Sequence, residues 1–136
     1  MENFYDRTLR LLGTDSVNKL NSAHVVILGV GGVGSWACEA LVRTGVGELT
    51  LVDFDCIEMS NLNRQVHALQ DTVGMLKVDA MEQRLKSINP NVVIHSFREK
   101  ISEGYLPEYL FNGDFTIDCI DDVRAKVAVI LWHLAN

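Results

Sequence analysis

The fold is decided by one stretch of sequence, His24-Val-Val-Ile-Leu-Gly-Val-Gly-Gly-Val-Gly34. Its first half is a short apolar run rich in β-branched residues, which is typical of a strand buried on both faces. Its second half, Gly29–Gly34, has the spacing G-x-G-x-x-G. From Val33 onward the apolar residues recur at helical spacing. A strand that ends in this glycine pattern and leads into a helix is typical of nucleotide-binding sites.

Each glycine of the pattern has a physical task. Gly29 permits the tight turn, Gly31 lets the backbone approach a phosphate, and Gly34 allows the helix to pack closely on the strand. The free N–H groups and the positive end of the helix attract an anion. Asp53, nineteen residues after Gly34, ends the next expected strand, where an acid accepts hydrogen bonds from ribose hydroxyls. The sequence therefore predicts a nucleotide site, and the chain contains no P-loop pattern.

The remaining apolar patterns predict strands that alternate with helices. Beyond the first strand, short apolar runs predict strands at Leu49–Val52, Val92–His95 and Phe115–Cys119. Three apolar stripes at helical spacing predict helices, and they comprise Val33, Ala37, Ala40, Leu41 and Thr44; Val78, Met81, Leu85 and Ile88; and Val123, Val127, Ile130, Leu131 and Leu134. Gly45 is placed to cap the first helix, and Asn89-Pro90 to end the second. Ser102–Phe111 is also expected to be helical, although Pro107 disfavours a long helix there.

Alternation of this kind indicates an α/β fold with right-handed crossovers. We expect a Rossmann-like, open, mostly parallel sheet with helices on both faces. Residues 1–22 form an expected amino-terminal helical segment, and residues 23–136 form the nucleotide-binding domain. A further strand normally follows a helix in such folds, so we expect either a piece of a larger enzyme, truncated before its last strands, or an unusually short enzyme.

Composition sets broad limits on function. The chain has 136 residues, which fits one domain. Twelve Lys and Arg against eighteen Asp and Glu give a net charge of −6, unlike a protein that grips nucleic acid with its whole surface. No apolar run approaches the roughly 20 residues that cross a bilayer, and the first ten residues do not resemble a signal peptide. Three cysteines cannot form a complete set of disulfides, and they favour a reducing cytoplasm.

A polar cluster follows the second expected strand and distinguishes between kinds of nucleotide enzyme. Phe54–Gln65 is too polar for another strand, and it starts at the sheet edge where ligands bind. Arg64 and Lys77 supply two cations, and Asp118, Asp121 and Asp122 supply carboxylates at the end of the last strand. A nicotinamide cofactor keeps its pyrophosphate and needs no such cluster. Splitting ATP requires Mg²⁺ and cations that neutralise the leaving pyrophosphate.

Five motifs in this order carry a family resemblance: GxGGxG at Gly29–Gly34, then LVDFD, SNLNRQ, VGMLK and DCIDD. Together they resemble the ThiF/MoeB/ubiquitin-activating superfamily of adenylating enzymes over nearly the whole chain. GVGSW, RTGVG and NRQVHAL are most similar to its tRNA threonylcarbamoyladenosine dehydratase branch. The molybdopterin and thiamine branches usually have NLQRQ where this chain has NLNRQ.

The resemblance implies roles for individual residues. Gly32 would present its N–H to the nucleotide, Asp53 would hold the ribose, and Asp121 would hold Mg²⁺. Arg7 corresponds to an arginine that family members donate across a dimer interface. The implied nucleotide-binding set is Gly29, Gly31, Gly32, Gly34, Asp53, Asp55, Asn61, Arg64 and Lys77, and the implied catalytic set is Arg64, Lys77, Asp121 and Arg7.

Family members activate a carboxylate by attack on the α-phosphate of ATP. In the dehydratase branch the carboxylate is the threonylcarbamoyl group of a modified adenosine in tRNA, and activation leads to a cyclised, dehydrated product. The expected partners are a second copy of the chain and either tRNA or a small carrier protein, with no membrane. Three alternatives stay open: adenylation of a carrier-protein terminus, a nicotinamide-dependent dehydrogenase, and a non-catalytic partner subunit.

Other polar residues are expected to play structural parts. Cys38, Cys56 and Cys119 are interpreted as packed, inert thiols, because free cysteine is usually buried. The histidines show no spacing typical of a zinc site. Arg98–Lys100 is interpreted as a solvated turn.

Overall fold

The computed structural model describes residues 2–136. Two helices, α1 (Asp6–Leu12) and α2 (Thr14–Ser22), precede the sheet. The strands are β1 (His24–Leu28), β2 (Glu48–Val52), β3 (Val93–Phe97) and β4 (Phe115–Asp118). The longer helices between and after them are α3 (Gly34–Thr44), α4 (Lys77–Ile88) and α5 (Val123–Ala135). Two 3₁₀ turns, η1 (Met59–Asn61) and η2 (Glu108–Phe111), lie in the connections.

The strands form one parallel sheet in the order β3-β2-β1-β4. The chain builds outward from β1 through β2 to β3, and then returns to place β4 on the other side of β1. Ligands bind where the strand order reverses in this way, outside the carboxyl ends of the strands. The predicted Rossmann-like sheet is confirmed, and its reversal point lies beside the glycine loop that follows β1.

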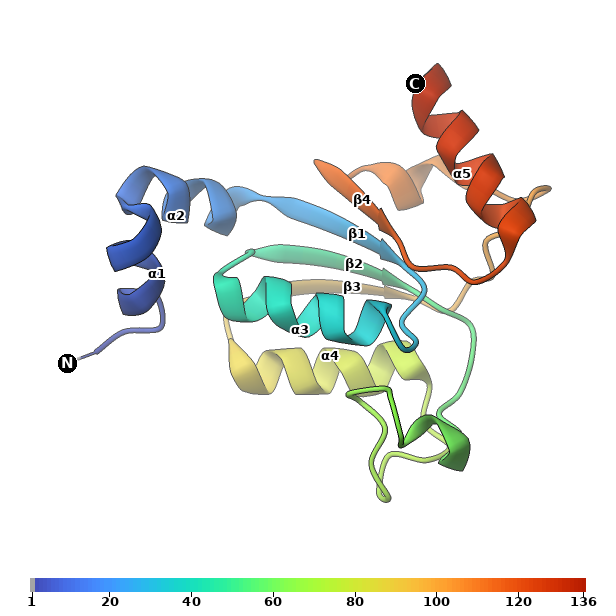
Figure 1. The fold of residues 1–136 in the computed structure, drawn as a ribbon, viewed down its shortest axis with the longest axis horizontal. Coiled ribbons are helices and arrows are strands. Elements are labelled where there is room, and N and C mark those ends of the chain that lie inside the picture. The colour runs from blue at the N-terminus through green and yellow to red at the C-terminus, as the bar shows by residue number, and fades with distance from the viewer. Residues whose placement is uncertain (1) are drawn as a thin grey trace.

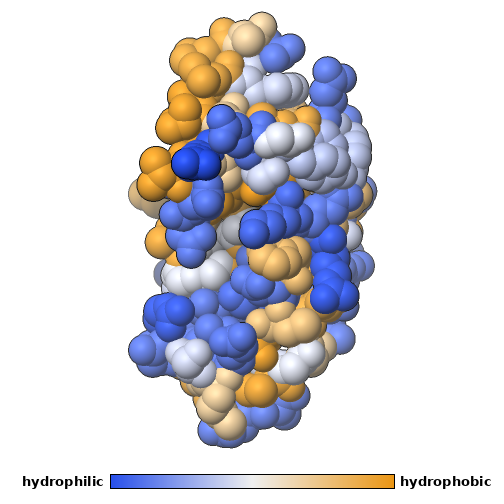
Figure 2. All heavy atoms as spheres, turned by 90° about the vertical axis from the view of Figure 1, so that its right-hand side faces the viewer, coloured by the Kyte–Doolittle hydropathy of each residue, from blue (hydrophilic) through white to orange (hydrophobic). Residues whose placement is uncertain are grey.

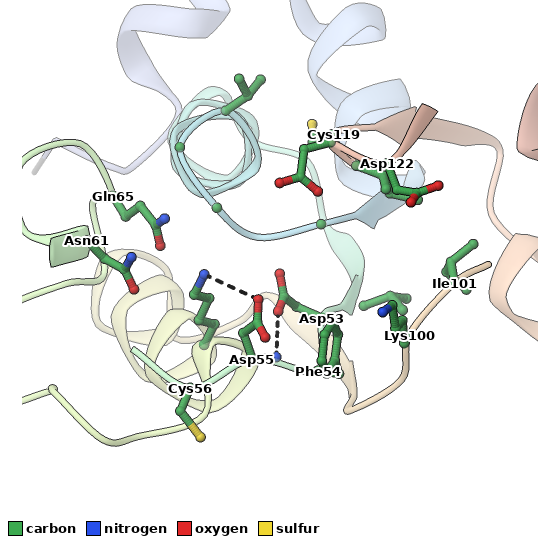
Figure 3. Close-up of a pocket in the computed structure, with 18 of the residues that line it drawn as sticks. Asp53, Phe54, Asp55, Cys56, Asn61, Gln65, Lys100, Ile101, Cys119 and Asp122 are labelled. Atoms are coloured by element: carbon green, nitrogen blue, oxygen red, sulfur yellow. Dashed lines mark hydrogen bonds and ion pairs between the residues drawn. The ribbon is translucent and has the colours of Figure 1, made fainter. Parts of the chain in front are cut away.

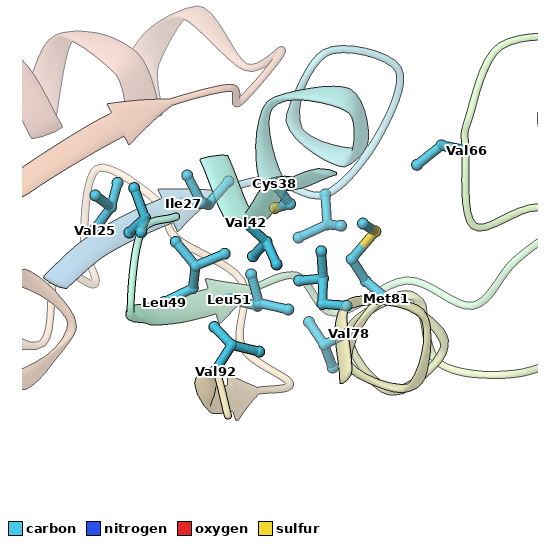
Figure 4. Packing of buried hydrophobic residues seen from close by; sticks show 13 residues of the cluster. Val25, Ile27, Cys38, Val42, Leu49, Leu51, Val66, Val78, Met81 and Val92 are labelled. Carbon is cyan, nitrogen blue, oxygen red and sulfur yellow. The ribbon is translucent and has the colours of Figure 1, made fainter. Parts of the chain in front are cut away.

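Helices cover both faces of the sheet (Figure 1). On one face α3 and α4 pack against β1 and β2 through a cluster that includes Ile27, Cys38, Leu51 and Met81 (Figure 4). On the other face, α5 and η2 pack through Val129 and the adjoining Leu110 and Phe111. The two clusters hold the carboxyl ends of the strands in a fixed arrangement, which positions everything described below.

The predicted apolar stripe of α3 is wrong in its phase. Val33 is 71% exposed, and Ala40 and Thr44 are exposed too, whereas Cys38 and Val42 are fully buried. The contact of the first helical residue with the end of β1 sets the rotation of the helix, so the residues four and eight positions later face the sheet. Glu39 is also buried, and its carboxylate accepts hydrogen bonds from Arg84 of α4 and from Arg43.

The last helix is confirmed, but its apolar stripe faces outward. Asp122 accepts a hydrogen bond from the Ala125 N–H and caps α5, which turns Ala125 and Val129 toward the sheet. Trp132 stacks on Phe111 of η2 at the same face. The outward stripe comprises Val123, Val127, Ile130, Leu131 and Leu134, whose side chains are between 49% and 80% exposed. Figure 2 shows hydrophobic residues gathered over this end of the molecule.

The expected helix over Ser102–Phe111 is not formed. A bridge joins Ser102 to Tyr105, and only Glu108–Phe111 forms a 3₁₀ turn. Pro107 stands directly before that turn in an extended conformation. A residue that precedes proline is pushed away from helical geometry, so a continuous helix cannot pass through this position.

Candidate active site

Close contacts at both ends shape the glycine loop. Gly29 has a φ of 90°, and a Cβ there would stand 2.7 Å from the carbonyl oxygen of Cys119. A Cβ on Gly34 would stand 1.8 Å from the Gly29 carbonyl oxygen, because α3 begins directly against the end of β1. The turn and the close helix packing expected of these two glycines are therefore present.

Gly31 and Gly32 differ from the other two glycines of the loop. A Cβ on either would meet no atom outside its immediate neighbours closer than 3.7 Å, and neither residue has a positive φ. Within residues 2–136 their N–H groups donate no hydrogen bond to the chain. The protein's own packing thus gives no reason for glycine at these positions, whereas a ligand that approaches the backbone would.

Asp53 ties the end of β2 to the loop. Its Oδ2 accepts a hydrogen bond from the Val30 N–H at 2.8 Å, and its Oδ1 accepts one from the Asp55 N–H at 2.9 Å. Each carboxylate oxygen has a second lone pair and can still accept from a ligand hydroxyl. The side chain is therefore both oriented and available.

The carboxyl ends of all four strands surround a single cavity of about 720 Å³ (Figure 3). Most of the residues expected at the site line it, namely Gly29, Gly31, Gly32, Asp53, Asp55, Asn61, Arg64, Lys77 and Asp121. Gly34 does not line it and acts in packing. Arg7 does not line it either: it lies on α1, which Figure 1 shows at the opposite end of the molecule from the start of α3.

One wall of the cavity comes from the polar segment after β2. Asn61 is buried, and its Oδ1 accepts a hydrogen bond from the Glu58 N–H, which leaves its amide N–H groups for the cavity. The Arg64 guanidinium donates to the Ser60 carbonyl at 3.1 Å, and the Arg64 carbonyl accepts from the Trp36 indole N–H. The Arg64 side chain passes close to Gly32. These contacts hold an amide and a cation beside the glycine loop.

Lys77 is the most unusual side chain of the site. It is 7% exposed and is the first residue of α4, and its N–H donates to the Asp55 carbonyl. The ammonium Nζ lies 3.9 Å from Asp55 Oδ2, which is too long for a hydrogen bond. A buried cation is expensive to desolvate unless it is paired. The geometry leaves this ammonium available to an anion in the cavity.

The three carboxylates after β4 have different tasks. Asp118 accepts from the Ile120 N–H and pairs with Lys126 at 3.0 Å, and Asp122 caps α5. Asp121 lines the cavity and makes no hydrogen bond or ion pair within the described part of the chain. A single free carboxylate beside a phosphate site fits Mg²⁺, which takes one or two carboxylates and completes its shell with phosphate oxygens and water.

The part of the far wall that follows β3 was not predicted from the sequence. Phe54 after β2, and Lys100 and Ile101 after β3, line the cavity opposite Asn61 and Gln65 (Figure 3). The Lys100 ammonium lies 5.2 Å from the centre of the Phe54 ring. Lys100 is exposed, as expected for a solvated segment, but it also lines the cavity, and that role was not predicted. The signal that could have found it is its place directly after a parallel strand.

The three cysteines differ in how far their side chains are buried. Cys38 is fully buried in the core, and burial raises the pKa of its thiol far above the usual value. Burial also raises the pKa of Cys119, which lies half-buried beside the glycine loop. Cys56 is exposed and lines the cavity, so its interpretation as a packed residue is wrong. It lies in the segment after β2 and forms an isolated backbone bridge with Leu76, while its side chain stays exposed.

Comparison with known proteins places this site in a family. The sequence pattern of the ThiF family matches residues 5–132, which is nearly the whole chain. The chain belongs to the ThiF family. The resemblance carried by the five motifs is therefore confirmed, and the parallel sheet of this ThiF-family chain is the scaffold on which those motifs meet.

Individual relatives of this ThiF-family chain are longer than it is. A tRNA threonylcarbamoyladenosine dehydratase of Haemophilus influenzae is 44% identical over 128 residues, which are 93% of this chain and 49% of that protein. A molybdopterin-synthase adenylyltransferase of the same organism is 36% identical over 118 residues, which are 87% of this chain and 49% of that protein. The chain spans about half the length of these curated relatives.

A solved structure agrees closely with the fold. The crystal structure of the Escherichia coli tRNA N6-threonylcarbamoyladenosine dehydratase in complex with ATP matches with a TM-score of 0.93 and 40% identity. The match covers 97% of this ThiF-family chain and 55% of that one.

Within residues 2–136, no helix has both the length and the apolar character that crossing a membrane demands. The same residues hold no group of three or more His, Cys, Asp or Glu side chains suited to a metal ion.

Proposed function

We propose that this chain binds ATP and forms the nucleotide-binding part of an enzyme that adenylates a carboxylate. The observation that carries the proposal is the buried ammonium of Lys77, whose nearest carboxylate is 3.9 Å away and which lines the same cavity as the exposed N–H groups of the glycine loop. A cation in this position is matched by a phosphate. The ATP-bound structure of the 40% identical relative supports the same nucleotide.

The residues divide the work along the nucleotide. Asp53 accepts hydrogen bonds from the ribose hydroxyls, and the N–H groups of Gly31 and Gly32 donate to phosphate oxygens. Asn61 and Arg64 donate to the phosphates from the opposite wall. Lys77 reaches the region of the α- and γ-phosphates and balances the charge that develops there. Asp121 would hold Mg²⁺, which when bound supplies further positive charge at the pyrophosphate.

In the reaction, a carboxylate oxygen attacks the α-phosphorus of ATP. A bond forms between that oxygen and the α-phosphorus as the bond to the bridging oxygen of the β-phosphate breaks, which gives an acyl-adenylate and pyrophosphate. The leaving pyrophosphate gains negative charge, and Lys77 and Arg64 are the cations of this chain placed to neutralise it.

We propose the threonylcarbamoyl group of a modified adenosine in tRNA as the carboxylate, with cyclisation and net loss of water as the outcome. The 44% identity to a named tRNA threonylcarbamoyladenosine dehydratase supports this choice. The second candidate is the carboxyl terminus of a small carrier protein, which the 36% identity to a molybdopterin-synthase adenylyltransferase favours. Both candidates share the adenylation step.

We further propose that the enzyme is a homodimer in which Arg7 serves the cavity of the other subunit. The distance between α1 and the glycine loop in Figure 1 supports action across an interface, because α1 is attached at the amino ends of the strands. The neighbouring apolar side chains Phe4, Leu11 and Leu12 are exposed and could be covered there. Residues 1–22, of which Met1 lies outside the described residues, would form this arm, and residues 23–136 the nucleotide-binding unit.

Free cysteines are consistent with a cytoplasmic location, which we propose for the protein.

The test of nucleotide choice is isothermal titration of the chain with ATP and with NAD, each in the presence of Mg²⁺. ATP is expected to bind more tightly, because only ATP presents a triphosphate to Lys77, Arg64 and the loop. Tighter binding of NAD would overturn the adenylation proposal.

A further inference from the structure

His67 lies in the loop between η1 and α4 and is 1% exposed, although its side chain is polar. Its Nε2 lies 2.7 Å from the carbonyl oxygen of Val30, the second residue of the glycine loop. A carbonyl oxygen can only accept, so Nε2 carries the proton and donates it. The contact joins two segments that are 37 residues apart in the sequence.

The carbonyl that His67 holds belongs to the peptide unit between Val30 and Gly31. A trans peptide is planar, and its carbonyl and N–H point in opposite directions. Fixing the Val30 oxygen toward His67 therefore fixes the Gly31 N–H on the other side of that plane. Gly31 lines the cavity, and its N–H has no partner among residues 2–136.

Asp53 holds the preceding peptide unit in the same way, since its Oδ2 accepts from the Val30 N–H at 2.8 Å. Two consecutive peptide units of the loop are thus fixed by hydrogen bonds, one to a carboxylate and one from an imidazole. The proposed role of Asp53 in ribose binding accounts for the first contact. Ribose binding does not account for the hydrogen bond between His67 and Val30.

Simple packing does not explain the imidazole. Its Nδ1 is buried and has no hydrogen-bond partner within the described chain, and an apolar side chain would avoid that cost. Burial lowers the pKa of His67 and outweighs the hydrogen bond to Val30 and the charge of Asp53, which raise it, so the ring is a neutral donor. The chain retains a costly polar group whose one hydrogen bond goes to the loop.

We propose that His67 is a positioning residue that aims the Gly31 N–H at a phosphate of the bound nucleotide. The inference rests on the proposed ATP binding and adds to it a residue that touches no ligand.

Three variants separate positioning from packing. His67→Gln places an amide N–H where Nε2 lies, His67→Asn places it near Nδ1 instead, and His67→Met fills the space with no donor. ATP affinity of His67→Met and of His67→Asn is expected to fall about tenfold, the effect of roughly one lost hydrogen bond. His67→Gln is expected to bind ATP nearly as the wild type does. Adenosine, which has no phosphate, is expected to bind all four proteins alike.

The measurements are titration with ATP and adenosine, and the ¹⁵N–¹H resonance of Gly31 without nucleotide. The Gly31 resonance is expected to shift in His67→Met and His67→Asn and to stay near its wild-type position in His67→Gln. Equal ATP affinity in His67→Gln and His67→Asn, or parallel losses of ATP and adenosine affinity, would overturn the inference. Should His67→Met fail to fold, the Gln and Asn pair alone decides. Failure of the wild type to bind ATP would count against the proposed function, and the Gly31 resonance would still report on the positioning.

Discussion

Lys77 shows how one residue connects the fold to the proposed chemistry. Its backbone N–H begins α4 by donating to Asp55, its stem is buried, and its ammonium reaches the cavity without a close partner. Asp121 has the complementary property of a free carboxylate at the same edge. Neither side chain belongs to the apolar clusters of the core. Removing either charged group therefore leaves the apolar clusters of the sheet intact.

We predict that Lys77→Ala and Asp121→Ala each lower the rate of cyclic nucleoside formation on tRNA by on the order of 10²–10³, because each loses charge stabilisation of the transition state. Circular dichroism should report an unchanged fold. Lys86→Ala is the matched control, since Lys86 lies on the same helix and pairs with Glu82 at the surface. A near-normal rate in either site variant removes that residue from the proposed machinery.

At the scale of elements, the sequence predicted which segments form strands and helices, with bounds within about two residues for most of them. The spacing of apolar residues and the positions of glycines suffice to predict the elements, because each element must bury an apolar side. The rotation of a helix about its axis is a different matter. The phase of α3 follows from the contact of Gly34 with Gly29, a tertiary contact that periodicity does not contain.

The site residues also fall into those that the sequence predicted and those that it did not. Asp53, Arg64, Lys77 and Asp121 could be placed together because the carboxyl ends of parallel strands meet at one edge. The part of the wall that follows β3, with Lys100 and Ile101, was missed because none of the five motifs includes it. His67 was missed because its partner is a backbone carbonyl, which has no signature in side-chain identity.

The start of α3 allows two glycines to be separated by experiment. Gly34→Ala drives a Cβ into a backbone oxygen, and we predict a loss of folding stability of about 1–3 kcal/mol or more. Gly31→Ala meets only ordinary contacts, so its unfolding midpoint in urea should stay close to that of the wild type. Its ATP affinity should still fall by about tenfold or more, because the methyl group impedes a charge-assisted hydrogen bond. Unchanged ATP affinity in Gly31→Ala would place the phosphates elsewhere.

At the scale of the whole molecule, the position of α1 far from the glycine loop makes Arg7 a test of assembly. We predict that Arg7→Ala and Lys77→Ala proteins are each inactive alone and regain activity when mixed. In a mixed dimer, one cavity keeps its own Lys77 and receives an intact Arg7, so about half the cavities of each heterodimer should work. Arg10→Ala is measured in the same way, because Arg10 lies on the same short helix and is the second candidate for this role.

Subunit exchange in the mixture is measured by mass spectrometry. Exchanged dimers that stay inactive would show that Arg7 does not act across an interface. Activity in the Arg7→Ala protein alone would remove it from the catalytic set.

The strand order also governs the timing of synthesis. β1 is the central strand, yet its partner on one side is β4, with Val25 opposite Phe115. At a ribosomal rate of roughly 5–20 residues per second, the ninety residues between these partners take about 5–18 s to make. For that interval the nascent chain carries an apolar strand with one edge unpaired, the kind of edge that captures other strands. The topology that creates the nucleotide crevice thus leaves one edge of the central strand unpaired in the growing polypeptide until β4 emerges.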